Sequence, residues 1–236
     1  MKKIIIYDFD GTLTPFPMPK LEFLEKCGFK DGLMNEEFGK RVAEISKRSN
    51  VDKYRALYEA LLSLLNEKNI RLDNKTLALG SDKVIYNKGV EEFLEYLNNN
   101  GVSNYLLSSG IKPFLYNVSI APLFKDIYAT TFKYDKDIVV NVDFLMSDLN
   151  KVEAIKDIMR VNNMKDCSDI IYIGDGLTDY FAMEFVVNNN GKTIFVYKDY
   201  NEEYINKMKS VISYHTKNDF SLNKELVSIV KELCDL

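Results

Sequence analysis

The later part of this 236-residue chain alternates short apolar runs with amphipathic segments, and this alternation constrains the fold most strongly. SNYLLSSG, DIYATTF, DIIYIG and KTIFVY are short, largely apolar runs that favour buried strands. The segments KGVEEFLEYLNNNG and NKVEAIKDIMRVNN carry apolar residues at helical spacing. Strands that alternate with helices indicate a parallel sheet with helices on both faces. We therefore expect an α/β fold with a doubly wound parallel sheet.

The beginning of the chain adds one more strand and then leaves the sheet. Residues 2–7 (KKIIIY) predict a short buried strand. The proline-rich stretch PFPMPK follows, and proline does not continue a strand ladder. Residues 21–69 then show helical periodicity, most clearly in YRALYEALLSLLNE. We expect residues 15–85 to form a small, mainly helical domain, and residues 1–14 and 86–236 to form the α/β core.

Two further segments complete the expected organisation. KYDKDIVVNVDF predicts a β-hairpin with a polar tip, and KPFLYNVSI predicts a helix. The tail holds two predicted helices around the short apolar piece SVISYH.

Composition narrows the class of protein. The formal net charge is −4 and the lysines are scattered, so nucleic acid is not an expected partner. The N-terminal apolar run is too short for a signal peptide or a membrane span, and we expect neither membrane association nor export. Three cysteines without a CxxC pair favour free thiols in a reducing cytoplasm: Cys27, Cys167 and Cys234.

Polar side chains stand where three of the expected strands end. They are Asp8 and Asp10 in DFDGT, Ser108 and Ser109 in LLSSG, and Asp175 and Asp179 in GDGLTD. In a parallel sheet these ends share one edge, where ligands bind. Two like charges about 4 Å apart repel by roughly 4 kcal/mol at an effective dielectric constant of about 20. Four carboxylates therefore need either a cation or the protonation of some of them. Oxygen ligands of this kind suit Mg²⁺ together with a phosphate.

A phosphate bound at this edge adds negative charge and calls for a basic side chain. Lys151 opens the helix before the third of these strands, which makes it the preferred residue. Lys156 lies further along the same helix. Lys133 and Lys136 lie in the predicted hairpin.

These motifs resemble those of the haloacid dehalogenase-like superfamily, in its phosphatase branch. DFDGTLT matches the first motif, LLSS the second, Lys151 the third and GDGLTD the fourth, over residues 2–197. The segment between the first two motifs resembles the helical cap of the phosphoserine-phosphatase-like subgroup. The resemblance implies a Rossmann-like catalytic core with a cap domain inserted after the first strand.

The resemblance also implies catalytic roles. Asp8 would attack phosphorus and form an aspartyl-phosphate. Asp10 would protonate the leaving oxygen and then activate water. Residues two apart in an extended segment face the same way, so both carboxylates would meet one phosphorus atom. Ser108 and the backbone N–H of Ser109 would bind phosphoryl oxygens.

The remaining implied roles concern charge. The Asp8 side chain, the Asp10 backbone carbonyl and Asp175 would hold Mg²⁺. Asp179 would either support the metal or orient Lys151. Mg²⁺ and Lys151 would then offset the charge of the transferring phosphoryl group.

The substrate is less well specified. Phosphoserine phosphatases carry an acidic residue soon after the first motif, whereas this chain has PFPMPK there, with Glu22 as the nearest acid. We expect a small phosphorylated metabolite other than phosphoserine. Phe16, Met18 and Phe23 are considered as residues that make the entrance of the site more apolar, and Arg41, Arg48 and Arg55 as basic residues available for recognition.

The leading interpretation is a Mg²⁺-dependent phosphatase of small molecules. A phosphomutase that uses the same aspartyl-phosphate is the first alternative. A binding protein without catalysis is the second, although four mutually repelling carboxylates serve no evident purpose in such a protein.

Overall fold

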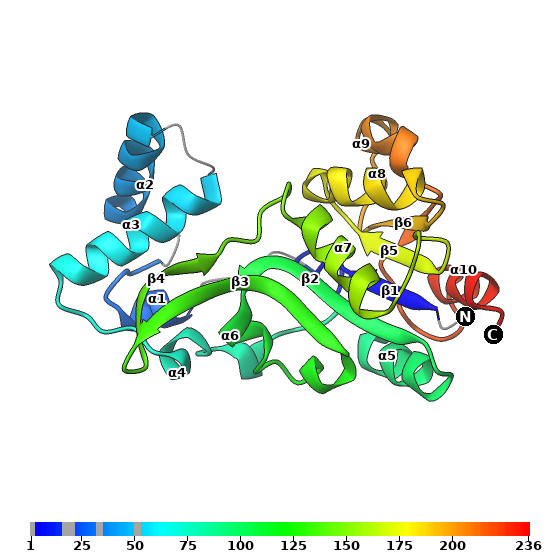
Figure 1. The fold of residues 1–236 in the computed structure, drawn as a ribbon, viewed down its shortest axis with the longest axis horizontal. Coiled ribbons are helices and arrows are strands. Elements are labelled where there is room, and N and C mark those ends of the chain that lie inside the picture. The colour runs from blue at the N-terminus through cyan, green and yellow to red at the C-terminus, as the bar shows by residue number, and fades with distance from the viewer. Residues whose placement is uncertain (1–2, 16–21, 32–34, 50–52) are drawn as a thin grey trace.

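The computed structural model describes residues 3–15, 22–31, 35–49 and 53–236 (Figure 1). Its centre is a seven-stranded sheet with the order β4-β3-β2-β1-β5-β6-β7. All neighbouring strands are parallel except β3 and β4, which are antiparallel. This arrangement confirms the predicted α/β fold. The strands are β1 (Ile4–Tyr7), β2 (Ser103–Ile111), β3 (Asp126–Asp135), β4 (Ile138–Phe144), β5 (Ile170–Gly174), β6 (Lys192–Tyr197) and β7 (Tyr214–Lys217).

Strand β1 lies at the middle of the sheet, where the strand order reverses. Tyr7 pairs with Leu106 of β2 on one side and with Ile173 of β5 on the other. From β1 the chain order runs through β2 and β3 in one direction and through β5, β6 and β7 in the other. In open α/β sheets the crevice outside the strand ends at such a switch point is the usual ligand site.

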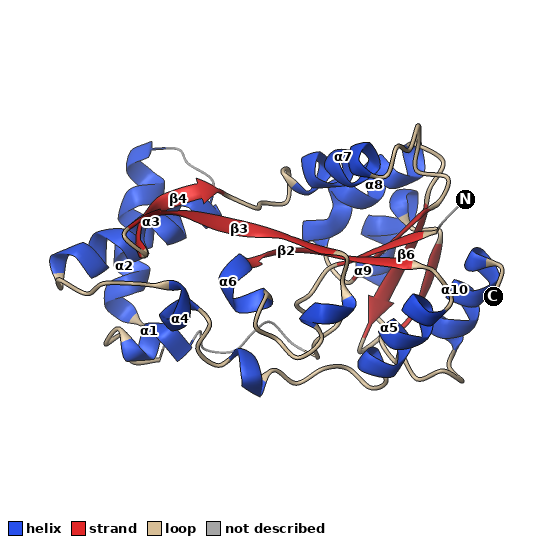
Figure 2. Ribbon diagram, turned by 60° about the horizontal axis from the view of Figure 1, so that its bottom comes forward, coloured by secondary structure: helices blue, strands red, loops and turns tan. Residues whose placement is uncertain are grey.

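Helices cover both faces of the sheet, because alternate residues of β1 point to opposite sides. Ile5 and Tyr7 belong to a core shared with helices α5 (Val90–Asn99) and α10 (Glu225–Cys234). Ile4 and Ile6 belong to a second core. Figure 2 shows two helices of this second face on the opposite side of the strands, α7 (Lys151–Val161) and α8 (Tyr180–Asn188). Helix α9 (Glu202–Met208) packs into the same core.

A group of helices lies at one end of the molecule, beside the hairpin of β3 and β4 (Figure 1). We call this group the inserted helices; it consists of α1 (Glu22–Lys26), α2 (Glu36–Ser49), α3 (Lys53–Glu67) and α4 (Asn74–Leu77). They follow β1 and precede α5, in the range expected to be helical. The division into two domains at residues 15 and 85 stays a prediction.

The predicted hairpin is confirmed, but it does not stand alone. Lys136 and Asp137 form its turn with φ angles of 46° and 69°. The Val139 N–H donates a hydrogen bond of 2.8 Å to the Leu72 carbonyl oxygen, beyond the end of α3. The hairpin therefore pairs with the segment that carries the inserted helices.

Two short segments differ from their predicted lengths or types. KPFLYNVSI forms only α6 (Lys112–Leu115), and the Asn117 side chain donates to the Pro113 carbonyl oxygen at 2.7 Å. The apolar piece in the tail leads into the edge strand β7.

Two properties bear on the expected class of protein. The three cysteines are unpaired, as predicted, and all three are buried. In the part of the chain that the structure describes, no helix has both the length and the apolar character needed to cross a bilayer.

Candidate active site

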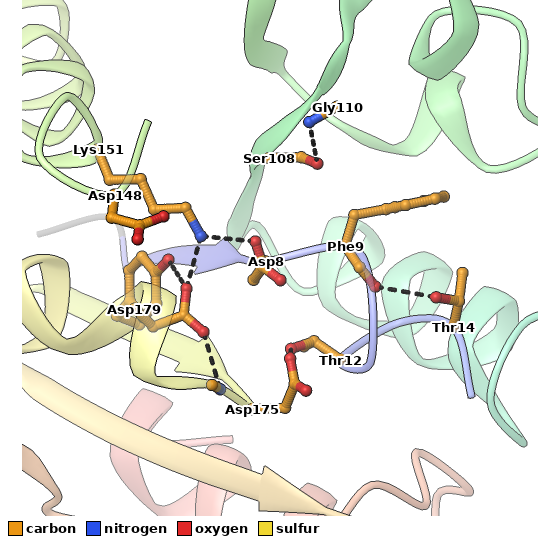
Figure 3. Close-up of polar contacts among 12 residues, drawn as sticks. Asp8, Phe9, Thr12, Thr14, Ser108, Gly110, Asp148, Lys151, Asp175 and Asp179 are labelled. Carbon is orange, nitrogen blue, oxygen red and sulfur yellow. Dashed lines mark hydrogen bonds and ion pairs between the residues drawn. The ribbon is translucent and has the colours of Figure 1, made fainter. Parts of the chain in front are cut away.

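The sequence-predicted side chains gather where β1, β2 and β5 end. Figure 3 shows Asp8 after β1, Ser108 near the end of β2, and Asp175 and Asp179 after β5. Lys151, the first residue of α7, reaches the same place from outside the sheet. The switch point of the sheet therefore carries the polar cluster.

Lys151 is the basic side chain of this cluster. It is 1% exposed, and its Nζ donates to Asp8 Oδ1 and to Asp179 Oδ1, both at 2.7 Å. Burial alone would lower its pKa, but Asp179 and Asp8 hold the pKa of Lys151 well above its ordinary value. By contrast, Lys156 pairs with Glu153 on the exposed side of α7. Lys151 is therefore a permanent cation between two carboxylates.

Lys133 and Lys136 do not join the cluster. Lys133 is exposed on β3, 3.9 Å from Asp143 of β4, and Lys136 is exposed in the hairpin turn. The predicted preference for Lys151 agrees with this geometry.

Asp179 is fully buried, and its carboxylate accepts three hydrogen bonds. Besides Lys151, the Tyr172 hydroxyl donates to Oδ1 at 2.7 Å and the Gly176 N–H donates to Oδ2 at 3.1 Å. A Cβ atom at Gly174 would lie 2.5 Å from Oδ2, so only glycine lets the strand end approach so closely. Of the two roles left open by the sequence, orienting Lys151 fits this environment.

The loop after β1 lies directly against Asp175. The Thr12 hydroxyl donates to Asp175 Oδ1 at 2.9 Å. Gly11 has a φ of +85°, and a Cβ atom there would lie 2.1 Å from Asp175 Oδ2. The Asn218 side-chain amide donates to the Gly11 carbonyl oxygen at 3.2 Å. Glycine at position 11 thus permits both the turn and the contact with the carboxylate.

Three carboxylates converge closely enough to share a cation. Oxygen atoms of Asp8, Asp175 and Asp179 lie within 4.8 Å of one another. Burial raises the pKa of Asp8 well above its usual range, although Lys151 opposes the rise. Burial, followed by the Asp179 charge, raises the pKa of Asp175 to about 7. Ionising these buried carboxyl groups is costly unless a positive charge lies nearby. Their oxygen atoms are ligands that suit a hard divalent cation such as Mg²⁺.

Asp10 is half-buried, two residues beyond Asp8, and is not among the three converging carboxylates. After burial, the charge of Asp10 is one of the causes that raise the pKa of Tyr58 on α3. The charge of Asp10 also contributes to the raised pKa of Asp175, so Asp10 is near both the carboxylate cluster and α3.

Ser108 is 1% exposed and Ser109 is half-buried. The Gly110 N–H donates to Ser108 Oγ at 3.1 Å (Figure 3). A donor to the serine oxygen leaves the serine proton available for another acceptor.

The residues considered for substrate recognition fare differently. Phe23 is fully buried in the core, so its predicted place at the entrance of the site is wrong. Its burial follows from its position on the inward side of α1, where Leu24 is also buried. Phe16 and Met18 lie outside the described residues.

The arginines considered for the same purpose lie on the inserted helices. Arg41 donates to Glu67 at 2.6 Å, and this exposed ion pair joins α2 to α3. Arg55 lies 3.7 Å from Glu59 on α3. The side chain of Arg48 lies outside the described part.

Sequence reasoning missed two groups that shape the site. Tyr172 is a buried residue of β5 and Thr12 belongs to the loop after β1. The position of Thr12 inside the DFDGT motif could have indicated its role. No sequence feature distinguishes Tyr172 from any other aromatic residue of a buried strand.

Comparisons with known proteins agree with this fold. Residues 5–184 match the family model described as haloacid dehalogenase-like hydrolase. A search of curated proteins found no match. A substrate-bound phosphoserine phosphatase complex has a TM-score of 0.65 at 19% identity, with 98% of each chain covered.

Two further solved structures show the same likeness. A phospho-aspartyl intermediate analogue of phosphoserine phosphatase has a TM-score of 0.62 at 19% identity, with 98% of each chain covered. Cytosolic 5′-nucleotidase IIIB bound to cytidine has a TM-score of 0.64 at 15% identity, covering 98% of this chain and 86% of that chain. At these identities the likeness shows a shared fold.

Proposed function

Because the chain belongs to the haloacid dehalogenase-like hydrolase family, we propose that it is a Mg²⁺-dependent phosphatase that hydrolyses a small phosphorylated metabolite. One observation carries this proposal: buried Lys151 bridges Asp8 and Asp179 at the switch point of the sheet, beside Asp175. A fixed cation among carboxylates at strand ends is the arrangement that phosphoryl transfer requires.

The first step transfers the phosphoryl group to the protein. A carboxylate oxygen of Asp8 attacks phosphorus and forms an aspartyl-phosphate, while the bond between phosphorus and the ester oxygen breaks. Asp10 gives its proton to the departing ester oxygen, which leaves as an alcohol. The place of Asp10 near α3, outside the group of three carboxylates, supports this role.

The second step releases phosphate. Asp10, now ionised, takes a proton from water, and the water oxygen attacks phosphorus. The bond to Asp8 breaks, inorganic phosphate leaves and Asp8 is restored as a carboxylate. Water and substrate are thus consumed, and an alcohol and phosphate are formed.

The other side chains hold charge in place. Ser108 and the Ser109 N–H bind phosphoryl oxygens, Lys151 offsets their charge, and Asp179 orients Lys151. Asp8, Asp175 and the Asp10 backbone carbonyl would hold Mg²⁺. When bound, Mg²⁺ would act as a Lewis acid on the phosphoryl oxygens.

The expected surroundings follow from the same proposal. The inserted helices act as a cap that excludes water, which favours small substrates over folded protein or nucleic acid. A net charge of −4 also argues against nucleic acid. We place the enzyme in the cytoplasm, and its unpaired, buried cysteines support a reducing compartment.

The test is phosphate release from an aryl phosphate and from a panel of phosphorylated metabolites, with and without Mg²⁺. The wild type is compared with Asp8→Asn, in which Lys151 keeps Asp179 as its partner. We expect Mg²⁺-dependent release that vanishes in the variant. Equal rates in both proteins would contradict the assigned mechanism. Transfer of phosphate to a sugar hydroxyl instead of water would favour the phosphomutase, and inactivity over the whole panel would favour the binding protein.

A further inference from the structure

One residue of the inserted helices touches the phosphate-binding end of β2. Tyr58 of α3 is buried, and its hydroxyl donates to the Ser109 carbonyl oxygen at 3.5 Å. Its ring meets Phe132 of β3 edge-on, with 5.6 Å between centroids and an interplanar angle of 77°. The contact joins two residues that are 51 positions apart in the chain.

The Ser109 carbonyl oxygen accepts a second hydrogen bond. The Thr130 hydroxyl of β3 donates to it at 3.3 Å, and a carbonyl oxygen has two lone pairs for two donors. Thr130 Oγ1 itself accepts the Met146 N–H at 3.2 Å, which leaves the Thr130 proton available for the Ser109 carbonyl oxygen. The hydroxyl groups of Tyr58 and Thr130 therefore both bind the C=O group of the peptide unit between Ser109 and Gly110.

The N–H group of that peptide unit, at its opposite edge, points toward Ser108 in the proposed phosphate site. In a trans peptide the C=O and N–H groups point in opposite directions, so donors that fix the Ser109 carbonyl also fix the Gly110 N–H. This N–H donates to Ser108 Oγ at 3.1 Å. The Ser108 oxygen is thereby an acceptor on one side, and its own proton points elsewhere.

We propose that Tyr58 is a positioning residue that acts through the peptide between Ser109 and Gly110 to aim the Ser108 proton at the phosphoryl group. This inference rests on the proposed function of the site. Hydrogen bonds in a chain strengthen one another, so seating α3 against the sheet strengthens the donor that binds phosphate. Tyr58 thus connects the inserted helices to the chemistry without touching the substrate.

The chemistry of Tyr58 suits a permanent donor. Burial raises its pKa well above the usual range for tyrosine. Tyr58 therefore keeps its proton near neutral pH, where it can donate to the Ser109 carbonyl oxygen.

A neighbouring tyrosine supplies a matched control. Tyr54 lies one turn earlier on α3, and its hydroxyl donates to Asp148 Oδ1 at 3.2 Å. Tyr54→Phe and Tyr58→Phe each remove one hydroxyl from the same helix, and only the second removes a donor to Ser109. Tyr58→Phe keeps the ring and its packing against Phe132, so the variant retains the fold.

The experiment measures orthovanadate binding in the presence of Mg²⁺ by calorimetry, together with kcat and KM for the best substrate of the panel. In Tyr58→Phe we expect the vanadate Kd to rise and kcat/KM to fall by about three- to tenfold, the worth of one neutral hydrogen bond. Tyr54→Phe is expected to leave the vanadate Kd unchanged.

Each outcome is decisive. If Tyr58→Phe leaves the vanadate Kd unchanged, or if Tyr54→Phe raises it equally, the connection through Ser109 is wrong, while turnover by the wild type still supports the phosphatase. If the wild type binds vanadate but hydrolyses no ester, the proposed function fails and the connection is still judged by binding alone. A wild type that binds no vanadate overturns the inference.

Discussion

Replacing Lys151 by methionine is the sharpest perturbation of the buried charges. Lys151 is 1% exposed and lies 2.7 Å from both Asp8 and Asp179. Each pair attracts by about 6 kcal/mol at an effective dielectric constant of about 20, and desolvation of the ions cancels much of this. Removing one partner of a buried pair costs about 3–5 kcal/mol, because the remaining charge stays buried. We expect Lys151→Met to lower the free energy of unfolding by that amount.

Urea unfolding followed by far-ultraviolet circular dichroism measures this loss, since the chain has no tryptophan to report by fluorescence. Chelator is present so that no cation replaces the lysine. Lys156→Met on the exposed side of α7 is the control and is expected to change stability by less than about 0.5 kcal/mol. A loss below about 1 kcal/mol in Lys151→Met would refute the argument that Lys151 neutralises the buried carboxylates.

A double variant separates charge from packing. In Lys151→Met/Asp179→Asn one of the two stranded charges is removed, and the amide still accepts the Tyr172 hydroxyl. We expect the double variant to be more stable than Lys151→Met alone. A further loss of stability would show that the methionine side chain, and not charge, causes the damage.

The other predictions concern the first loop, the metal site and the thiols. Gly11 and Gly28 share a φ of +85°, but a Cβ atom at Gly11 alone would lie against Asp175. Replacing either glycine by alanine should lower the free energy of unfolding by about 1–2 kcal/mol through backbone strain. Only Gly11→Ala should also weaken Mg²⁺ binding measured by calorimetry. Equal Mg²⁺ affinity in the two would contradict the contact with Asp175. The pKa of Asp175 is raised to about 7 in the folded protein, so protonation of Asp175 stabilises the folded state. In the presence of chelator, the melting temperature should therefore fall as the pH rises from about 4 through 7. The fall should be smaller in Asp175→Asn. Burial raises the pKa of Cys167 to about 12, so iodoacetamide at pH 8 should label it only after unfolding, and rapid labelling of the native protein would argue against its burial.

The strands and the place of the site were predictable because both follow from short-range patterns. Apolar runs that end in polar residues mark strands of a parallel sheet, and such strands bring their ends to one edge. Asp8, Ser108, Lys151, Asp175 and Asp179 therefore meet as the sequence predicts. The order of the motifs along the chain was sufficient to predict this meeting, because a parallel sheet places the ends of all the strands that carry them at the same edge.

What escaped prediction depends on contacts across long separations. The hydroxyl of Tyr172 on β5 donates to Asp179, which lies in the turn after the same strand. No sequence pattern distinguishes Tyr172 from the other aromatic residues of buried strands. The sequence of the hairpin did not indicate the backbone hydrogen bond between Val139 and Leu72. Phe23 was expected at the entrance and is buried, because the sequence alone does not say which face of a short helix points inward.

The central claim is that Asp8 carries the phosphoryl group. Reduction with borohydride during turnover converts an aspartyl-phosphate into homoserine, which peptide mass spectrometry locates. The account predicts homoserine at position 8 that forms only with substrate and Mg²⁺ present and is absent in Asp8→Asn. Reduction at another carboxylate, or turnover without any reducible acyl phosphate, would contradict it.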